Sequence, residues 1–418
     1  MTTAAAPLVP FPRVFYVANG IELLERLSFY GVYINLQVYL VNDVGLTAAA
    51  VGTLLGIFAI GRAWLPVAVG GVADRMGFRT SLLIAFTAYA LAYGTLFSAP
   101  TRPLAYTAIA LMSVGGAFMK PVIMGCVKKY SPEGRQTTGF AIFYAMVNAG
   151  SVVGKIAVSQ IRTHISLRAS MLTSVVGSVL ALLVTALAFF EPVAEVEAGA
   201  PAKPAVPLMD TVKAFGQAFA KPRLTIFLLL VSGYYLLIEQ FYQTFPLYME
   251  RTLGESFPRE LITLINPLSI AILQVPVARF TKKLDPLSAM AIGIGIGGVS
   301  MVTMGLYPGL VGAASSFFVF AVAEMVFSPR YYDYVASFAP KGQEGMYMGL
   351  SLAPFGVGGL VGGILSGRLI EAYLPKGGTL QPLKVWGTYA AIGAVCASTL
   401  VAYRWFVARA DAKLGEAA

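Results

Sequence analysis

The chain has 418 residues, of which 57% are hydrophobic and 12% are charged, and its formal net charge is +10. Soluble proteins contain about 45–50% apolar and about 25% charged residues, so this composition excludes a soluble enzyme, a disordered protein and a nucleic-acid-binding protein. In a membrane protein, a basic excess is expected in loops on the cytoplasmic side. Cys126, Cys396 and the single His164 are too few for a metal cluster, so we expect no metal and no other cofactor.

Apolar segments long enough to cross a bilayer recur along the whole chain. A spanning helix needs about 20 mainly apolar residues. About twelve such segments are predicted, at 14–41, 49–73, 80–98, 104–127, 137–160, 169–190, 224–249, 258–280, 287–307, 311–335, 345–374 and 384–407. Charges interrupt the first segment, so it does not resemble a cleaved signal peptide. Prolines 246, 267, 329 and 354 are predicted bends, and the small residues of 356–367 predict close helix packing.

The segment between the sixth and seventh spans divides the chain. Residues 192–209 are rich in Ala and Pro and predict a linker. In residues 210–223, Val212, Phe215 and Phe219 recur at helical spacing, which predicts a short helix on the membrane surface with Asp210 as its N-cap. The predicted units are therefore two six-helix halves, 1–191 and 223–418, joined by 192–222. This is the all-α arrangement of the major facilitator superfamily, in which substrate binds between the halves.

The loops indicate an orientation and a gating motif. Lys and Arg concentrate in the loops after even-numbered spans, which places both termini and the linker in the cytoplasm. Between the second and third spans lies GGVADRMGFR, residues 70–79, which resembles the loop signature of this superfamily. Its glycines permit a tight turn, and its Asp and Arg can tie helix ends across the bundle in the inward-closed state. The alternative is an ordinary basic loop. The motif residues are Gly70, Asp74, Arg75, Gly77 and Arg79.

Charges also lie inside the first span. Glu22, Glu25 and Arg26 in the string ELLERLSFYG are spaced so that they share one helix face. Each ionisable group inside a span costs about 2.5–3.5 kcal/mol on insertion scales, which argues for a function. One guanidinium cannot neutralise two carboxylates, so one carboxylate is expected to bind and release a proton during transport.

The same string resembles the first-span signature of the proton-dependent oligopeptide transporter family, peptide symporters within the major facilitator superfamily. Further weak matches occur in order along the chain, in GGAFMKPV, FAIFYAMVNAGS, IEQ, INPL and AEMVFSP. The chain is therefore identified as a divergent member. Together, the buried charges and the resemblance assign proton coupling to Glu22, Glu25, Arg26, Lys120 and Glu324. The predicted substrate-binding residues are Tyr30, Tyr33, Arg62, Lys120, Asn148, Glu239, Asn266 and Glu324.

Several positions depart from that family's pattern. Tyr33 stands where the family has an arginine that receives the peptide carboxylate, and Ala63 replaces a common cavity tyrosine. Arg62 and Lys155 are intramembrane cations that the pattern does not require. One hypothesis is that Arg62 binds the substrate carboxylate in place of the missing arginine. In the alternative, Arg62 pairs with Glu22 or Glu25 and tunes the proton site. The role of Lys155 stays open.

The predicted function is a proton-coupled symporter of small peptides or other carboxylate-bearing solutes, working by alternating access. We expect a monomer in the plasma membrane, the inner membrane in a bacterium, with substrate, protons and lipid as its partners. The main alternative is a proton-driven antiporter that exports drugs or metabolites. A membrane-embedded enzyme has less support, because no nucleophile, base or metal set is spaced for catalysis within the spans.

Overall fold

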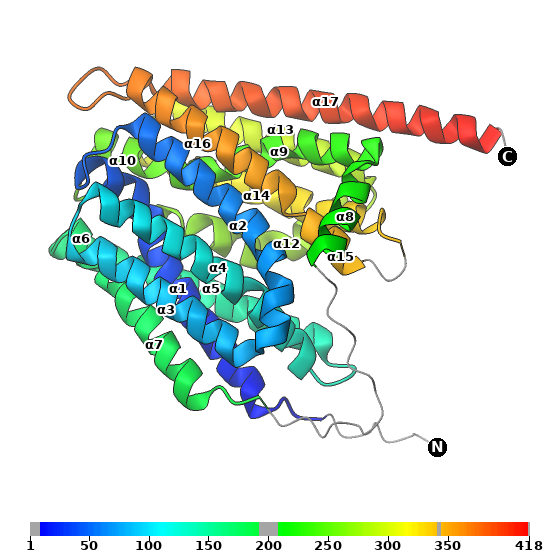
Figure 1. Cartoon of the computed structure of the whole chain (residues 1–418). Helices are drawn as coiled ribbons and strands as arrows, with labels where there is room; N and C mark the ends of the chain where they lie inside the picture. Colours follow the sequence, from blue (N-terminus) through cyan, green and yellow to red (C-terminus); the bar gives the residue numbers. More distant parts are fainter. Residues whose placement is uncertain (1–8, 192–207, 341–343, 417–418) are drawn as a thin grey trace.

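The computed structural model describes residues 9–191, 208–340 and 344–416, whose regular elements are all α-helices (Figure 1). The first group comprises α1 (Arg13–Asn42), α2 (Ala48–Met76), α3 (Phe78–Ser98), α4 (Arg102–Tyr130), α5 (Gln136–His164), α6 (Leu167–Ser170) and α7 (Leu172–Ala188). The second comprises α8 (Leu208–Phe219), α9 (Pro222–Gln243), α10 (Phe245–Leu253), α11 (Arg259–Ile262), α12 (Ile265–Thr281), α13 (Pro286–Leu306), α14 (Leu310–Ala336), α15 (Glu344–Leu350), α16 (Ala353–Tyr373) and α17 (Pro382–Glu416).

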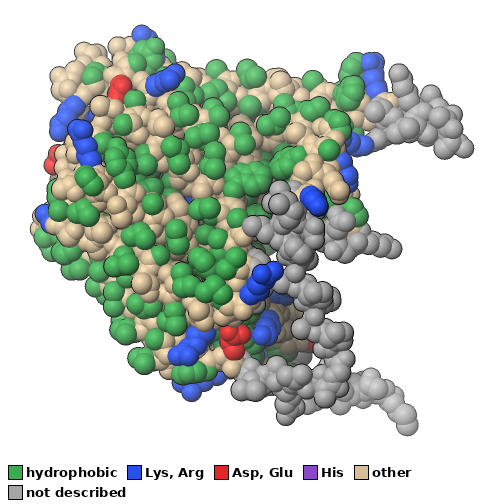
Figure 2. All heavy atoms as spheres, in the orientation of Figure 1, with side chains coloured by type: hydrophobic (Ala, Val, Ile, Leu, Met, Phe, Trp, Pro, Cys, Tyr) green, Lys and Arg blue, Asp and Glu red, His purple; other side chains and the backbone are tan. Residues whose placement is uncertain are grey.

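These helices account for the predicted spans. Eleven stretches of the described residues are helical, long and apolar enough to cross a membrane. The twelfth span is α1, in which three central charges lower the hydropathy. Its 30 residues extend about 45 Å at 1.5 Å per residue, more than the hydrocarbon core of about 30 Å requires. Figure 2 shows hydrophobic side chains over most of the visible face, with Lys and Arg toward its ends. The predicted all-α membrane fold is confirmed.

Four predicted spans consist of two helices rather than one. The breaks fall at Met171 between α6 and α7, at Thr244 between α9 and α10, at 263–264 between α11 and α12, and at 351–352 between α15 and α16. Pro246 and Pro354 lie in the first two positions of α10 and α16, where the missing N–H has no intrahelical partner to lose. These prolines therefore begin new helices, whereas Pro329 lies inside α14.

The helix after the linker begins earlier than expected. It starts at Leu208, so Asp210 lies inside α8 and the prediction that Asp210 is its N-cap is wrong. The predicted linker 192–207 lies outside the described residues. Figure 1 shows α8 crossing the ends of the long helices beside α15. The rings of Phe215 and Phe219 lie 6.3 and 5.9 Å from that of Trp64 on α2. We call this the α8 end of the bundle; α1 begins and α17 ends there (Figure 1).

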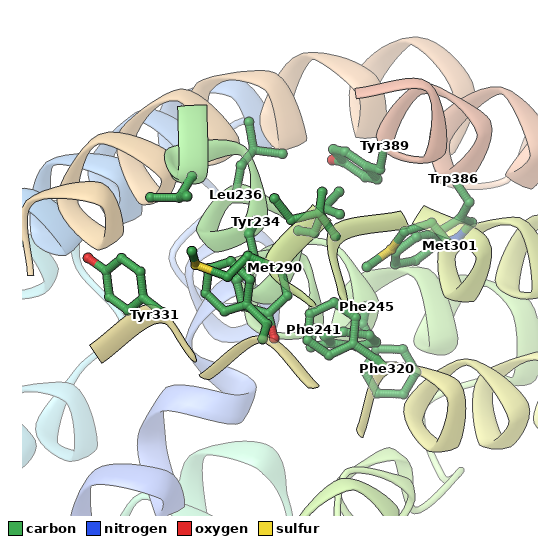
Figure 3. Close-up of a cluster of buried hydrophobic side chains, with 14 of the residues drawn as sticks. Tyr234, Leu236, Phe241, Phe245, Met290, Met301, Phe320, Tyr331, Trp386 and Tyr389 are labelled. Carbon is green, nitrogen blue, oxygen red and sulfur yellow. The ribbon is translucent and has the colours of Figure 1, made fainter. Parts of the chain in front are cut away.

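Two buried clusters form the core, one mainly from α1–α7 and the other mainly from α9–α17. In the second, Tyr234 stacks on Phe327 with ring centroids 3.8 Å apart, and Phe241 and Phe320 lie beside it (Figure 3). Between the clusters, α2 and α16 touch through their backbones. A Cβ added at Gly363 would lie 2.4 Å from the carbonyl oxygen of Gly52. The close packing predicted for 356–367 is confirmed and holds the two groups of helices together.

Candidate functional site

A cavity of about 330 Å³ lies between the two groups of helices. A second cavity of about 160 Å³ lies on the side of α4 and α1. Phe29, Arg62 and Phe355 line both, so they form the partition between the two cavities. The structure brings the predicted substrate-binding residues together here. Tyr30, Tyr33, Arg62, Asn148, Glu239, Asn266 and Glu324 line the larger cavity, and Lys120 lines the smaller one.

The charged residues of α1 form a buried cluster. The Arg26 Nε atom lies 3.2 Å from Glu22 Oε1, and the same guanidinium binds Glu25. The Tyr89 hydroxyl donates to Glu25 Oε1 over 3.3 Å. Glu22 and Glu25 are each 1% exposed. One guanidinium is therefore placed between two carboxylates, the geometry expected from their spacing along the helix.

The cluster opens onto the smaller cavity. Glu25, Arg26 and Lys120 line it together, and Lys120 is exposed within it. Among the described residues, no carboxylate lies within 4 Å of the Lys120 amine. Lys120 therefore faces the cluster across the cavity and is available to a mobile group that enters it.

The two carboxylates of the larger cavity already have neutral hydrogen-bond donors. Glu239 Oε2 accepts from the Tyr33 hydroxyl over 2.7 Å and from Gln243 Nε2 over 3.0 Å. Glu324 Oε2 accepts from Asn266 Nδ2 over 3.2 Å. The bond from Tyr33 joins α1 to α9. Tyr33 thus bridges the two groups of helices at the centre of the cavity.

Arg62 is surrounded by aromatic rings. Its guanidinium carbon lies 4.8 Å from the ring centre of Phe29, and 5.0 Å from those of Tyr33 and Phe355. Its Nη1 atom is buried without a hydrogen-bond acceptor. Within the described chain it forms no ion pair with Glu22 or Glu25, both of which bind Arg26 instead. The geometry gives no support to the alternative that Arg62 pairs with that cluster.

Lys155 is the second cation of the larger cavity. It is 3% exposed, and its Nζ atom lies 4.9 Å from the ring centre of Tyr30. In the part of the chain that the structure describes, it has no carboxylate within 4 Å. Its surroundings are thus a ring face and the cavity.

The loop motif acts within the first group of helices. Gly77 has φ +80° between α2 and α3, a conformation that favours glycine. The backbone N–H groups of Phe78 and Arg79 donate to Glu191 Oε1 over 2.9 and 3.2 Å, as expected for an anion at a helix N-terminus. The Arg79 side chain donates to the Ala186 carbonyl over 2.7 Å.

Arg79 therefore ties α3 to the end of α7 in this conformation. The expectation that the Asp and Arg of the motif join helix ends across the bundle concerns the inward-closed state and stays a prediction. Arg75 is exposed near the end of α2, and Gly70 belongs to α2. The side chain of Asp74 lies outside the described part of the chain.

A buried polar network at the end of the bundle opposite α8, the far end, was missed. Glu260 Oε1 accepts from Asn35 Nδ2 over 2.7 Å, and Arg162 donates to both of its carboxylate oxygens. Arg162 Nη2 also donates to the Phe257 carbonyl over 2.6 Å. Arg162 and Glu260 are 8% and 0% exposed.

A second pair extends this network. Arg259 Nη1 lies 3.3 Å from Glu250 Oε2, and Arg259 Nε donates to Asn35 Oδ1 over 3.0 Å. Asn42 donates to the other oxygen of Glu250. The far-end network therefore consists of Asn35, Asn42, Arg162, Glu250, Arg259 and Glu260, and it joins α1 and α5 to α10 and α11. Hydrogen bonds and ion pairs join the two groups of helices at Tyr33 and at positions nearer the far end. Among the described residues other than Arg223, no such bond lies nearer the α8 end.

The sequence carries a family signal that agrees with this architecture. The model of the Major Facilitator Superfamily matches residues 21–349. The chain belongs to the Major Facilitator Superfamily. It is therefore a transporter of small molecules rather than an enzyme, and a multi-pass protein of the inner membrane.

The relatives and solved structures are of three kinds, a multidrug resistance protein, a peptide transporter and a nucleoside transporter. Multidrug resistance protein MdtH of Citrobacter koseri is 24% identical over 392 residues, which cover 92% of each chain. The peptide transporter POT in complex with sulfate has a TM-score of 0.78 at 18% identity, over 95% of each chain. A variant of the nucleoside transporter NupG has a TM-score of 0.77 at 18% identity, over 93% of this chain and 99% of that one. The predicted likeness to the oligopeptide transporters is confirmed at the level of fold.

Proposed function

We propose that this member of the superfamily is a proton-coupled symporter of small carboxylate-bearing solutes, peptides among them. The observation that carries the proposal is the buried cluster in α1, where Glu22 and Glu25 share Arg26. Removing charges from water costs several kcal/mol per ion unless each is paired. Two carboxylates on one guanidinium leave one negative charge uncompensated, and binding a proton removes it.

Proton binding at this cluster can change substrate binding, because residues of the cluster line the smaller cavity and Arg62 lines both cavities. Arg26 is among these residues. When a proton neutralises Glu22 or Glu25, Arg26 loses one of its two partners and the positive charge facing the cavities rises. An anionic substrate then binds more tightly. The two binding events are thermodynamically linked, so each favours the other.

Arg62 is the residue that we assign to the substrate carboxylate. Its Nη1 atom is buried without an acceptor, and such a donor carries a desolvation penalty of about 1–3 kcal/mol. A carboxylate that enters the cavity would supply the missing acceptor with charge-assisted hydrogen bonds. The neighbouring carboxylates Glu239 and Glu324 are already bonded to neutral donors and leave Arg62 to the substrate.

Alternating access completes the proposed cycle. The far-end network joins the two groups of helices at one end of the bundle, and the close contact of α2 with α16 continues from Ala48 and Gly367 at that end to Ala63 and Gly356. Transport then requires the far-end network to separate while the α8 end closes. Superfamily members rock their halves about a central site in this way.

Export is the second candidate function, because the curated relatives are multidrug resistance proteins. The two functions differ in which way a proton gradient drives solute. For a symporter, a vesicle interior that is alkaline relative to the medium drives accumulation of solute; for an antiporter, an acidic interior does.

The test uses purified protein in liposomes, with radiolabelled dialanine and glutarate as probes. We expect accumulation of a probe with an alkaline interior and none when a protonophore is present. Glu22→Gln combined with Glu25→Gln is expected to abolish accumulation while leaving counterflow, and the exposed Glu133→Gln serves as the matched control. Accumulation only with an acidic interior would support export. Uphill uptake that persists unchanged in the double variant would refute the role of the α1 cluster.

A further inference from the structure

The larger cavity contains two cations that have no carboxylate within 4 Å among the described residues, although Arg62 interacts with Glu239 at longer range. Arg62 has a buried nitrogen without a hydrogen-bond acceptor. Lys155 is 3% exposed, and its amine lies over the ring of Tyr30 and lines the cavity. The two carboxylates of the cavity, by contrast, accept hydrogen bonds from Tyr33, Gln243 and Asn266. An acidic group of a ligand can therefore pair with either cation, whereas both carboxylates already have a neutral hydrogen-bond donor.

The two cations lie at different places along an aromatic cluster. Lys155 lies over the ring of Tyr30, and Arg62 lies over the ring of Tyr33. The ring of Tyr242 is 6.2 Å from that of Tyr30 and 5.1 Å from that of Tyr33, so it links the two. A ligand that lies along these rings reaches one cation with each end, while its middle contacts aromatic surface.

Helix α5 adds neutral donors beside Lys155. Asn148, Ser151 and Lys155 all line the cavity, and their spacings of three and four residues place them on one face of the helix. An amide, a hydroxyl and an ammonium group on one face form a set that can donate several hydrogen bonds to a single acidic group. The cavity of about 330 Å³ admits only a small molecule of this kind.

We propose that Lys155, with Asn148 and Ser151, forms a second anion subsite, so that the preferred substrates are small molecules with two acidic groups. One acid binds Arg62 and the other binds Lys155. Burying an ammonium group without an anionic partner destabilises the protein. An acidic group of the ligand would supply that partner to Lys155. The inference rests on the proposed binding of a carboxylate by Arg62 and adds the class of substrate.

The test compares diacids with their monoamide twins, which have nearly the same shape. Glutarate is compared with glutaramate, and the dipeptide Ala-Glu with Ala-Gln, by calorimetric titration of the purified protein. We expect each diacid to bind about 10-fold more tightly than its monoamide twin, since the second carboxylate forms a charge-assisted hydrogen bond that the neutral amide does not. Lys155→Met is expected to remove this preference, and Lys155→Arg to retain it.

Two further measurements separate binding from structure. Lys155→Met is expected to raise the melting temperature of the ligand-free protein, because it removes an unpaired buried charge. Lys384→Met is the matched control, because the Lys384 amine lies 5.1 Å from the ring of Tyr373 but on an exposed surface outside the cavity. In this variant, the preference for diacids and the melting temperature should both stay unchanged.

The outcomes distinguish this inference from the proposed function. If the monoamides bind as tightly as the diacids to the native protein, the second subsite is refuted while carboxylate binding at Arg62 stands. If Lys155→Met is too unstable to purify, equal binding of the twins to Lys155→Arg refutes the subsite by itself. If none of the four probes binds, the subsite and the carboxylate role of Arg62 both fail, and proton coupling is judged from the liposome experiment alone.

Discussion

The far-end network offers a quantitative test of how this transporter changes conformation. Glu260 accepts hydrogen bonds from Asn35 and from two nitrogens of Arg162, and all three side chains are at least nine-tenths buried. Glu260→Gln keeps the shape of the side chain but removes its charge. Arg162 would then lose its carboxylate partner and keep only neutral acceptors, among them the carbonyls of Glu255 and Phe257.

The size of the effect follows from the burial. Removing one partner of a buried ion pair costs about 3–5 kcal/mol. The loss falls on the state with a closed far end, because opening that end lets water reach Arg162. At 1.4 kcal/mol per factor of ten, the equilibrium should shift by about 10²- to 4 × 10³-fold toward a far end that is open. The lower figure is our expectation, since Gln still accepts one hydrogen bond.

The shift is measured as access to the cavity from the far end. Ile238 lines the larger cavity, and Ile238→Cys in a background with Cys126→Ala and Cys396→Ala supplies one thiol. A membrane-impermeant maleimide is added to sealed vesicles on the far-end side. Glu260→Gln should raise the labelling rate at least 10-fold, whereas the exposed Glu133→Gln should leave it unchanged.

One result would refute this reasoning: an unchanged labelling rate in a Glu260→Gln protein that purifies and melts like the native one. Asn42→Ala provides a milder variant in case Glu260→Gln fails to fold. It removes one hydrogen bond to Glu250, a contribution of about 1.5–3 kcal/mol for a bond to a charged group, and should raise the rate in the same direction.

Two further predictions concern stability. Gly363→Ala should destabilise the protein by about 1–3 kcal/mol through overpacking, since its Cβ would lie 2.4 Å from the Gly52 carbonyl oxygen. Gly94→Ala is the control, because a Cβ there would have nothing within 4 Å. Equal melting temperatures of the two variants would contradict the close contact. Asp285 caps α13 by accepting from the Ser288 N–H over 3.0 Å, so Asp285→Ala should cost about 1 kcal/mol and Asp285→Asn less. Burial raises the pKa of Asp285, but the hydrogen bonds from Ser288 and the Arg404 guanidinium lower it by more. The pKa of Asp285 therefore lies below its ordinary value. Its stabilisation should therefore be complete above about pH 5 and decline below about pH 4; a constant difference from Asp285→Ala between pH 7 and pH 3.5 would contradict this.

The spans and the α1 cluster were predictable because each leaves a local signal. A run of about 20 apolar residues has few alternatives to a membrane helix, and Glu22, Glu25 and Arg26 are close enough in sequence for helix geometry alone to bring them together. The break at Thr244 had a local signal in Pro246, a predicted bend, whereas the break at Met171 had none. Met171 lies inside an apolar stretch, and a helix that restarts in line keeps the same hydropathy as an unbroken one. The division into 1–191, 192–222 and 223–418 and the cytoplasmic position of the termini stay predictions.

The partners of Arg62 and Lys155 were beyond sequence reasoning because they depend on contacts between helices far apart in the chain. Position alone showed that both cations lie in spans. Only the packing of Phe29, Tyr33, Phe58 and Phe355 around Arg62 shows that this guanidinium lies among rings and forms no ion pair with the α1 cluster. The hypothesis that favoured a free Arg62 over one paired with Glu22 or Glu25 agrees with this geometry.

The far-end network was missed for a different reason, which bears on mechanism. Arg162, Glu250, Arg259 and Glu260 lie near the ends of spans, where charges are normally solvated, so their presence carries no signal. Their burial exists because helices of the two groups meet there. Under the proposed alternating access, we expect these charges to be paired and buried in one state and hydrated in the other, whereas the charges of the α1 cluster lie inside a span in both. We therefore propose that the far-end network determines which end is open and that proton binding at the α1 cluster determines when the ends exchange.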